Sequence, residues 1–433
     1  MNEISSITES QLVSEMPASP DELIAQLASI GRAAQRECAA MDSASRAAAL
    51  QGAATHMRKG AKDILAANAK DVEAARANGL SSAMIDRLTL DEGRLESVAS
   101  AVEAVAVLPD PVGEVIDEAV RPNGLKLSRV RVPIGTIGII YESRPNVTAD
   151  AAALCVRAGN AAILRGGSEA VHSNRAILSA FAAGLEEGGV PAGLVQLVPT
   201  QDRAVVGAML TASGMIDMIV PRGGKSLVAR VQADARVPVL AHLDGVNHTY
   251  VHSMADPAMA REIAVNAKMR RTGICGAMET LLIDAQFADA AGLVARLIEA
   301  GVELRGDGRA QALDDRIAEV SDDDWGTEYL DAILSVAIVD GIESALAHIS
   351  KYSSAHTDAI ITDDLAAAEQ FLTCVDSAIV MHNASSQFAD GGEFGLGAEI
   401  GIATGRLHAR GPVALEGLTT YKWLVRGSGQ VRP

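Results

Sequence analysis

Short apolar runs alternate with longer helical stretches between residues 136 and 241, and this pattern constrains the fold more than any other feature. Within each run the residues are apolar at consecutive positions, which is typical of strands buried on both faces. Helices between such strands favour a parallel sheet covered on both sides. Ligands on these sheets bind at the carboxyl ends of the strands. The five runs are 136–141 (TIGIIY), 161–165 (AAILR), 194–198 (LVQLV), 216–220 (IDMIV) and 237–241 (VPVLA).

Other patterns flank this alternation. Residues 20–108 are alanine-rich, with apolar positions at helical spacing. Pro122-Asn123-Gly124 then separates two alternating runs, which predicts a β-hairpin that can pair with another element or subunit, the tail TTYKWLVRGSGQ being one candidate. From about residue 244 a second series of strands and helices begins. These patterns together predict an α/β fold for the chain.

Charge and cysteine content exclude several classes of protein. The formal net charge of -18 argues against nucleic acid or an anionic membrane as partner. No transmembrane or secretory segment is visible, so the cytoplasm is the default compartment, where the four thiols are reduced. The cysteines show no metal-ligand spacing. For His242, His248 and His252, hydrogen-bonded histidines are more probable than a metal site, so we expect no metal.

Two strands end in an arginine followed by paired glycines. Arg165-Gly166-Gly167-Ser168 follows the second run, and Arg222-Gly223-Gly224-Lys225-Ser226 follows the fourth. Glycines let backbone N–H groups approach an anion, and a helix N-terminus and basic side chains add positive charge. Each motif alone is equally consistent with a tight turn, but the two together favour a dinucleotide. Because Arg165 stands where NAD-binding sheets carry an acidic residue, NADP is preferred.

Cys275 differs from the other cysteines, which lie in helical or apolar segments typical of structural thiols. It lies between Gly273 and Gly276, directly after the basic segment 268–271. Positive charge favours the thiolate where it points toward the sulfur, and glycines leave room for a substrate. This environment favours a catalytic nucleophile over a chance loop cysteine.

Six long motifs together resemble one known family. They occur in the family's order and span roughly residues 20–425, and they resemble the glutamate-5-semialdehyde dehydrogenases, also called gamma-glutamyl phosphate reductases, within the aldehyde dehydrogenase superfamily. The motifs are YESRPNVT (141–148), ILRGGSEA (163–170), VPRGGKS (220–226), RTGICGAMETLLI (271–283), EFGLGAEIGI (393–402) and LHARGPVALEGLTTYKW (407–423).

The resemblance implies an aldehyde dehydrogenase-like fold, with a Rossmann-type parallel-sheet domain, an α/β catalytic domain and a small β oligomerisation element. It also implies NADPH-dependent reduction of L-glutamate 5-phosphate in proline biosynthesis by a homo-oligomer, with the upstream glutamate kinase as a candidate partner. We divide the chain into a disordered leader (1–19), an NADP-binding domain (20–113 and 133–243), a catalytic domain (244–406) and an oligomerisation hairpin and tail (114–132 and 407–433).

The resemblance also assigns roles to single residues. Cys275 matches the nucleophile, and Asn146 matches the asparagine that completes the oxyanion hole with the Cys275 N–H, although helix capping is the alternative for this residue. Glu328 matches the glutamate that holds the nicotinamide ribose. Four basic residues in the motifs are candidates for the substrate's phosphate and α-carboxylate, although an ion pair is as consistent for each: Arg144, Arg406, His408 and Arg410.

The implied reaction proceeds through a thioester. The Cys275 thiolate displaces phosphate from the acyl phosphate, and hydride from NADPH then gives the aldehyde. Water is not a reactant, so the base that hydrolytic relatives carry in a Glu-Leu-Gly-Gly motif is unnecessary. The corresponding stretch here, HLDGVNH, offers Asp244 and no glutamate.

Three positions depart from the family pattern: Gly276 where asparagine is expected, Asn247 where cysteine is expected, and Gln387 where arginine is expected. The first could alter the loop beside the nucleophile, and the third could remove a contact to the substrate. Two other functions stay open at this point. One is a hydrolytic NAD(P)-dependent aldehyde dehydrogenase, and the other is a non-catalytic nucleotide-binding or scaffolding relative.

Overall fold

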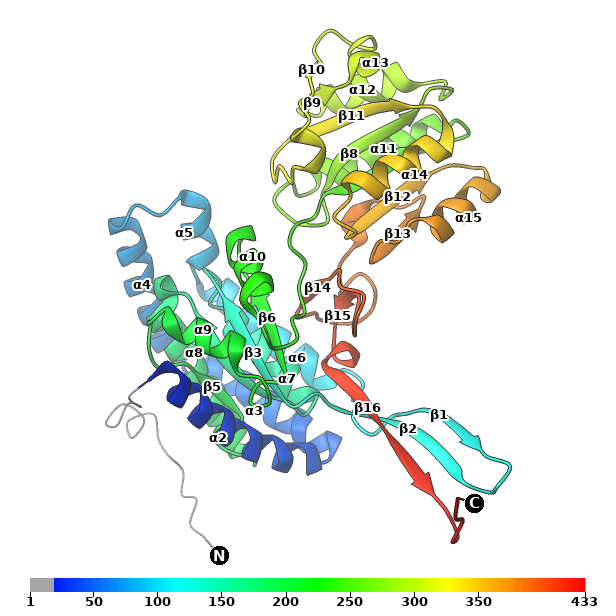
Figure 1. The fold of residues 1–433 in the computed structure, drawn as a ribbon. Coiled ribbons are helices and arrows are strands. Elements are labelled where there is room, and N and C mark those ends of the chain that lie inside the picture. The colour runs from blue at the N-terminus through cyan, green and yellow to red at the C-terminus, as the bar shows by residue number, and fades with distance from the viewer. Residues whose placement is uncertain (1–18, 433) are drawn as a thin grey trace, which may run out of the picture. The chain divides into compact units, whose positions relative to one another are not determined.

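The computed structural model describes residues 19–432, which divide into two compact units (Figure 1). The first unit contains the described residues up to Leu240, with 396–401 and 413–432, and the second contains 241–395 and 402–412. The predicted leader lies outside the described residues except for Ser19. Its side chain accepts a hydrogen bond from the Glu22 N–H and caps the first described helix.

The predicted helical region is confirmed by five helices. Four of them begin at a serine or aspartate whose side-chain oxygen accepts a backbone N–H three residues further on, the usual N-cap. The five helices are α2 (Pro20–Ala40), α3 (Ser43–Lys59), α4 (Ala61–Ala77), α5 (Ser82–Leu88) and α6 (Glu92–Val107).

A four-stranded parallel sheet with the order β5-β4-β3-β6 forms the centre of the first unit. Every residue of β3 and β4 is buried, which explains why these strands are apolar without alternation. The strands are β3 (Thr136–Tyr141), β4 (Ala161–Gly166), β5 (Val195–Leu197) and β6 (Met218–Arg222), and the helices between and after them are α7 (Val147–Arg157), α8 (Val171–Glu187), α9 (Ala204–Thr211) and α10 (Lys225–Asp234).

The fifth predicted strand, 237–241, is wrong. Only a single bridge joins this run to the sheet, between Val239 and Ile219. Pro238 accepts a hydrogen bond from the Ile219 N–H but has no N–H of its own to donate, so the ladder cannot extend through it.

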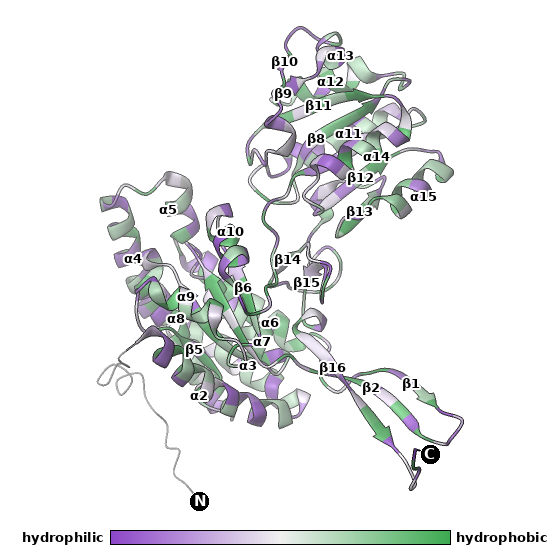
Figure 2. Cartoon of the chain, viewed as in Figure 1, coloured by the Kyte–Doolittle hydropathy of each residue, from purple (hydrophilic) through white to green (hydrophobic). Residues whose placement is uncertain are grey.

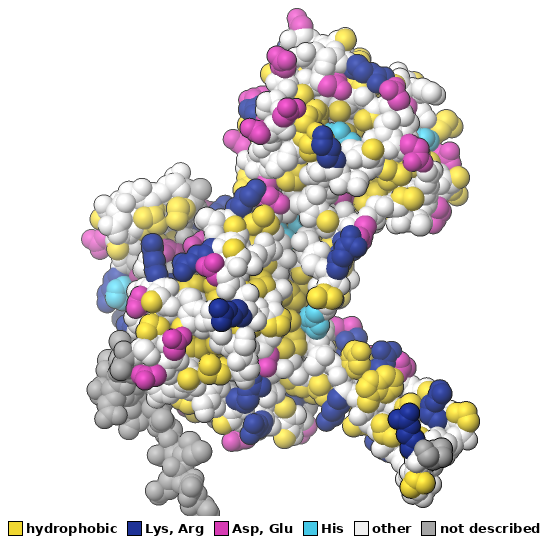
Figure 3. All heavy atoms as spheres, in the orientation of Figure 1, with side chains coloured by type: hydrophobic (Ala, Val, Ile, Leu, Met, Phe, Trp, Pro, Cys, Tyr) yellow, Lys and Arg dark blue, Asp and Glu magenta, His cyan; other side chains and the backbone are white. Residues whose placement is uncertain are grey.

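The predicted hairpin is confirmed, and so is its pairing with the tail. Strands β1 (Val115–Val120) and β2 (Lys126–Pro133) are antiparallel, and β16 (Thr419–Arg426) pairs with the other edge of β2. Gly124 has φ +85° in the connecting turn, a conformation that favours glycine. Apolar side chains remain exposed on the outer strands (Figure 3): Val115, Ile116, Val120, Tyr421, Trp423 and Val425.

The second unit is built on a seven-stranded parallel sheet with the order β10-β9-β11-β8-β7-β12-β13. Its central strands are strongly hydrophobic (Figure 2), and all seven residues of β8 are buried. The strands are β7 (Asn247–Val251), β8 (Met278–Asp284), β9 (Glu303–Gly306), β10 (Ala318–Glu319), β11 (Ile333–Val339), β12 (Thr357–Ile361) and β13 (Ile379–His382).

Helices connect these strands, as the sequence predicts for a parallel sheet. They are α11 (Pro257–Met269), α12 (Ala290–Glu299), α13 (Gly308–Gln311), α14 (Gly341–Tyr352) and α15 (Leu365–Cys374). Two short strands, β14 (Gly401–Ala403) and β15 (Gly411–Val413), pair with each other near the end of the chain. Among the described helices, none is long and apolar enough to cross a membrane.

A buried ion pair joins α11 to β8. The Lys268 Nζ lies 2.5 Å from Glu279 Oε2, and neither side chain is exposed. Burial lowers the pKa of Lys268 and raises that of Glu279 to about 7, so each group depends on the other to stay charged. The pair lies at both ends of the loop that carries Cys275.

We expect Glu279→Ala to destabilise the protein by about 3–5 kcal/mol, because it leaves a buried ammonium without its partner. The double variant Lys268→Met/Glu279→Leu replaces the pair with apolar groups and should recover most of this loss. Urea unfolding followed by circular dichroism measures both. A single variant no less stable than the double variant would show that the pair is not needed.

Candidate active site

Cys275 lies, half-buried, in the loop between α11 and β8. Of the basic residues before it, Lys268 is hydrogen-bonded to Glu279, while Arg270 and Arg271 are exposed. Lys268 therefore serves the buried ion pair, and the sequence-based idea that it points toward the sulfur is not supported. The loop is fixed in other ways.

Asn247 fixes the backbone on either side of the cysteine. Its amide nitrogen donates to the Cys275 carbonyl at 2.6 Å and to the Ala277 carbonyl at 2.7 Å, and its amide oxygen accepts the Thr357 N–H at 3.0 Å. The side chain is fully buried. One amide thus ties β7 and β12 to the loop, a role that no local sequence pattern predicts.

Gly245 and Glu328 meet at the same loop. A Cβ on Gly245 would lie 2.1 Å from the Cys275 carbonyl oxygen, so only glycine fits against this backbone. The Gly245 N–H donates to Glu328 Oε1 at 3.0 Å. The structure therefore brings Glu328, a predicted ribose ligand, into contact with the segment that packs on the nucleophile.

Two histidines lie beside the sulfur. Cys275 Sγ and one ring nitrogen each of His242 and His356 lie within 4.8 Å of one another. The His242 Nδ1 lies 2.7 Å from the Ile402 carbonyl oxygen, and the two rings pack edge to face at 5.0 Å. Of the other histidines weighed from the sequence, His248 contacts Asp358 instead.

A sequence signal for His242 existed. When HLDG is compared letter by letter with Glu-Leu-Gly-Gly, His242 and not Asp244 takes the place of the glutamate. His356 lies on β12, far along the chain, and carried no signal at all. Parallel pairing of β12 with β7 brings it close.

The three departures from the family pattern all surround the cysteine loop. Besides Asn247, Gln387 is buried, and its amide donates to the carbonyls of Ala267 at 2.9 Å and Arg271 at 3.2 Å. A Cβ on Gly276 would lie 3.2 Å from the Ser386 carbonyl oxygen. Gln387 therefore holds the end of α11, and its amide nitrogen is directed at backbone carbonyls.

Asn146 lies in the first unit, at the start of α7. Its side chain makes no capping hydrogen bond, so the helix-capping alternative is wrong. The amide nitrogen instead donates to Asp150 Oδ2 at 2.8 Å. Burial raises the pKa of Asp150 to about 6. The second N–H of this amide is left for another acceptor.

The two glycine motifs lie at one edge of the first sheet. Strand β3 pairs with both β4 and β6, and Tyr141 is in register with Gly166 and with Arg222. The motifs Gly166-Gly167-Ser168 and Gly223-Gly224-Lys225-Ser226 therefore flank the carboxyl end of β3, where a nucleotide on such a sheet would bind.

A carboxylate lies beside each motif, since a Cβ on Gly167 would collide with the Glu169 carboxylate and Glu142 contacts Gly224. Glu169 accepts hydrogen bonds from the Ser143 N–H at 2.5 Å and hydroxyl at 3.0 Å, and Ser143 has φ +47°, a strained value for this residue. Glu142 accepts the Gly224 N–H at 3.3 Å. Glu169 thus holds the turn that leads to Asn146.

Arg165 is largely buried and donates to the carbonyls of Gly166 at 2.6 Å and Gln201 at 3.0 Å. Its burial lowers its pKa. In contrast, Lys225 and Ser226 are exposed at the start of α10. Lys225 is therefore more accessible to a phosphate than Arg165.

The predicted substrate-binding residues are not equivalent. Arg406 and Arg410 both form ion pairs with Asp376, which agrees with the ion-pair alternative. His408 is exposed with φ +66° in the same segment of the second unit, and Arg144 is exposed in the first unit.

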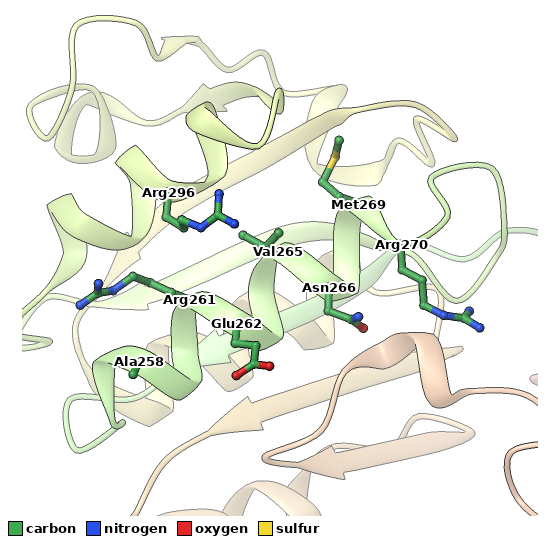
Figure 4. Close-up of a pocket in the computed structure, with 8 residues that line it drawn as sticks. All are labelled: Ala258, Arg261, Glu262, Val265, Asn266, Met269, Arg270 and Arg296. Atoms are coloured by element: carbon green, nitrogen blue, oxygen red, sulfur yellow. The ribbon is translucent and has the colours of Figure 1, made fainter.

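A hollow of about 530 Å³ lies elsewhere in the second unit (Figure 4). It runs along the outer face of α11, with Arg296 of α12 on one side. No residue discussed as catalytic lines it. The lining residues are Ala258, Arg261, Glu262, Val265, Asn266, Met269, Arg270 and Arg296.

Two features together define the class of this protein. The first unit has a parallel sheet with glycine motifs at the carboxyl ends of its strands, and the second unit presents a cysteine in a glycine loop. The chain belongs to the aldehyde dehydrogenase family, whose model matches residues 2–314. Its relatives include gamma-glutamyl phosphate reductases. That of Novosphingobium aromaticivorans is 72% identical over 415 residues (96% of this chain, 98% of the relative), and that of Zymomonas mobilis is 62% identical over 418 residues (96% and 98%).

Solved structures agree with this assignment. The crystal structure of gamma-glutamyl phosphate reductase from Thermotoga maritima matches with a TM-score of 0.93 and 42% identity, covering 95% of this chain and 100% of that one. An engineered glycolyl-CoA reductase with bound NADP⁺ matches with a TM-score of 0.67 at 17% identity, covering 93% and 96%, which shows the fold alone. The predicted fold class and the family resemblance are confirmed.

We expect Asn247→Asp to impair catalysis although aspartate and asparagine are nearly the same size. The aspartate carboxylate would face two carbonyl oxygens and could donate to neither. Loss of these hydrogen bonds should cost about 1–3 kcal/mol of stability and displace the Cys275 backbone. Urea unfolding and the alkylation rate of Cys275 measure the two effects. As a matched control, Asn266→Asp on the exposed face of α11 should change neither. An Asn247→Asp protein with normal stability and alkylation would contradict this role.

Proposed function

We propose that this protein reduces L-glutamate 5-phosphate to L-glutamate 5-semialdehyde and phosphate with NADPH, as a step of proline biosynthesis. The observation that carries the proposal is the Cys275 loop, whose backbone is fixed by Asn247 and Gly245. Relatives that carry the name gamma-glutamyl phosphate reductase share up to 72% identity over nearly their whole length.

In the proposed reaction the Cys275 thiolate attacks the γ-carbonyl carbon, the bond to the phosphate oxygen breaks, and a thioester forms. Hydride from the nicotinamide adds to the thioester carbon, and the resulting thiohemiacetal expels the thiolate to give the aldehyde. One NADPH and one proton are consumed, and phosphate is released. The Cys275 N–H and the Asn146 amide, which Asp150 orients, are the proposed donors to the developing oxyanion.

The hydrolytic alternative requires a carboxylate base beside the cysteine. His242 stands there instead, and the glutamate of the same region, Glu328, accepts a hydrogen bond from Gly245. This favours a reductase in which phosphate, and not water, takes part. A non-catalytic relative would have no need for the two hydrogen bonds by which Asn247 holds the nucleophile's loop.

For the cofactor, an aldehyde dehydrogenase fold of this type accommodates NAD or NADP. We propose NADP(H), with its phosphates at the two glycine motifs and Glu328 on the nicotinamide ribose. Lys225 replaces Arg165 as our preferred phosphate contact, because Lys225 is exposed at these motifs while Arg165 is largely buried. For the substrate, we keep Arg144, Arg406, His408 and Arg410 as candidates, and at Arg406 and Arg410 a substrate carboxylate or phosphate would have to compete with Asp376.

The assembly and location of the protein are also proposals. The exposed apolar side chains of the β1-β2-β16 sheet favour a homo-oligomer built through these strands. A thiolate nucleophile needs a reducing compartment, which favours the cytoplasm. The acyl-phosphate substrate must come from a kinase, and the upstream glutamate kinase is the candidate partner.

The reaction is most easily tested in reverse. With glutamate semialdehyde and NADP⁺, we expect NADPH to form only when phosphate is present, because phosphate must resolve the thioester. Cys275→Ser should abolish turnover, while Cys374→Ser, at an exposed position, should not alter it. Absorbance of NADPH follows both. Turnover without phosphate would favour the hydrolytic alternative, and full activity of Cys275→Ser would exclude the mechanism.

A further inference from the structure

Cys275, His242 and His356 form a compact set of side chains that can ligate a metal. Their three ligand atoms lie within 4.8 Å of one another, and this is the one group of its kind in the part of the chain that the structure describes. A thiolate and two imidazoles are ligands that zinc prefers, and three protein ligands leave a fourth position open. All three residues belong to the second unit.

His242 is held in the form that binds metal. The Ile402 carbonyl can only accept a hydrogen bond, so the Nδ1 of His242, 2.7 Å away, carries the proton. The lone pair is therefore on Nε2. Metal-ligating histidines usually donate their other ring N–H to a carbonyl or carboxylate in this way, which fixes the tautomer and the ring orientation.

His356 supplies a second, independent observation. The side chain is completely buried, and among the described residues its Nε2 has no hydrogen-bond partner. Its Nδ1 lies 2.9 Å from the Thr357 hydroxyl oxygen, which can accept the Nδ1 proton. A buried nitrogen without a partner is costly, and a metal ion would satisfy it.

The geometry requires a small contraction. With Zn–N and Zn–S bonds of about 2.0–2.3 Å, the ligand atoms of a tetrahedral site lie roughly 3.3–3.8 Å apart. Ligand atoms as far apart as 4.8 Å must therefore close by about 1 Å, a movement that rotation of the side chains can supply. Asn247 fixes the Cys275 backbone and keeps the sulfur within reach of both rings.

We propose that Cys275, His242 and His356 bind one zinc ion, and that the bound zinc blocks the nucleophile and reversibly inhibits the enzyme. Binding replaces the thiol proton, so that the thiol and Zn²⁺ give a zinc thiolate and H⁺. The inhibitory part rests on the proposed function, because it requires Cys275 to be the nucleophile. The binding part does not.

Cobalt substitution tests binding without any assay of activity. Addition of Co²⁺ to the full chain should produce a thiolate-to-cobalt charge-transfer band, which one equivalent of Zn²⁺ abolishes. Cys275→Ser should remove the band, and His242→Gln should weaken it. Cys374→Ser, which changes an exposed thiol outside the set, should keep it. A band that is absent from the wild-type protein, or that survives in Cys275→Ser, would overturn the proposal.

Inhibition is tested separately. Zinc should slow iodoacetamide alkylation of Cys275, measured by peptide mass spectrometry, and a chelator should restore both alkylation and turnover. Measured against its own turnover without zinc, His356→Gln should require at least about tenfold more zinc than the wild-type protein for half-inhibition. Inhibition unchanged in a folded His356→Gln protein would overturn the proposal. If that variant does not fold by circular dichroism, the cobalt band of His242→Gln decides, and an unweakened band there counts against the site.

The two proposals can fail independently. A zinc-sensitive cobalt band at Cys275 in a protein that lacks phosphate-dependent turnover would leave the metal site standing and remove the reductase. Phosphate-dependent turnover that zinc does not inhibit, in a protein without a cobalt band, would support the reductase and exclude the metal site.

Discussion

The amide of Asn247 is the interaction on which the rest of the site depends. A cysteine placed in a glycine loop gains room for a substrate but loses a defined position, because glycines allow many backbone conformations. Three hydrogen bonds from one buried amide restore that position and connect it to two strands of the seven-stranded sheet. Gly245 then packs on the same carbonyl, where no side chain would fit. The backbone that carries the nucleophile is thus tied to the sheet.

The three departures from the family pattern are best understood as parts of this one arrangement. Asn247 donates to the Cys275 carbonyl, Gln387 donates to a carbonyl at the end of α11, and Gly276 lies against the Ser386 backbone. From the sequence they looked like separate changes with separate effects. Because all three contact the same loop, their energetic effects should be coupled, and a change at one position alters what the others must provide.

The sequence predicts those features that local patterns determine. Buried strands such as 136–141, the hairpin around Gly124 and the helices before it follow from periodicity and turn chemistry, and they are present. The fifth strand failed because one proline outweighs an apolar run. The site was harder, since Arg165 is occupied by two carbonyls and His356 reaches Cys275 only through the pairing of β12 with β7. Such contacts depend on strand order, which no local pattern contains.

The same features that suit Cys275 to catalysis also expose it to metals. A nucleophile must be accessible, and it benefits from a neighbouring imidazole whose lone pair is fixed by a carbonyl on the other ring nitrogen. A metal ion that prefers sulfur and nitrogen ligands binds to the same pair of groups, an accessible thiolate and an imidazole lone pair. His356 adds a second imidazole for which acyl transfer requires no role, and its buried Nε2 lacks a hydrogen-bond partner among the described residues. An arrangement selected only for thioester chemistry would gain by satisfying that nitrogen within the protein, and so an unpartnered imidazole nitrogen in the same cluster as the sulfur is better explained by a ligand that binds there.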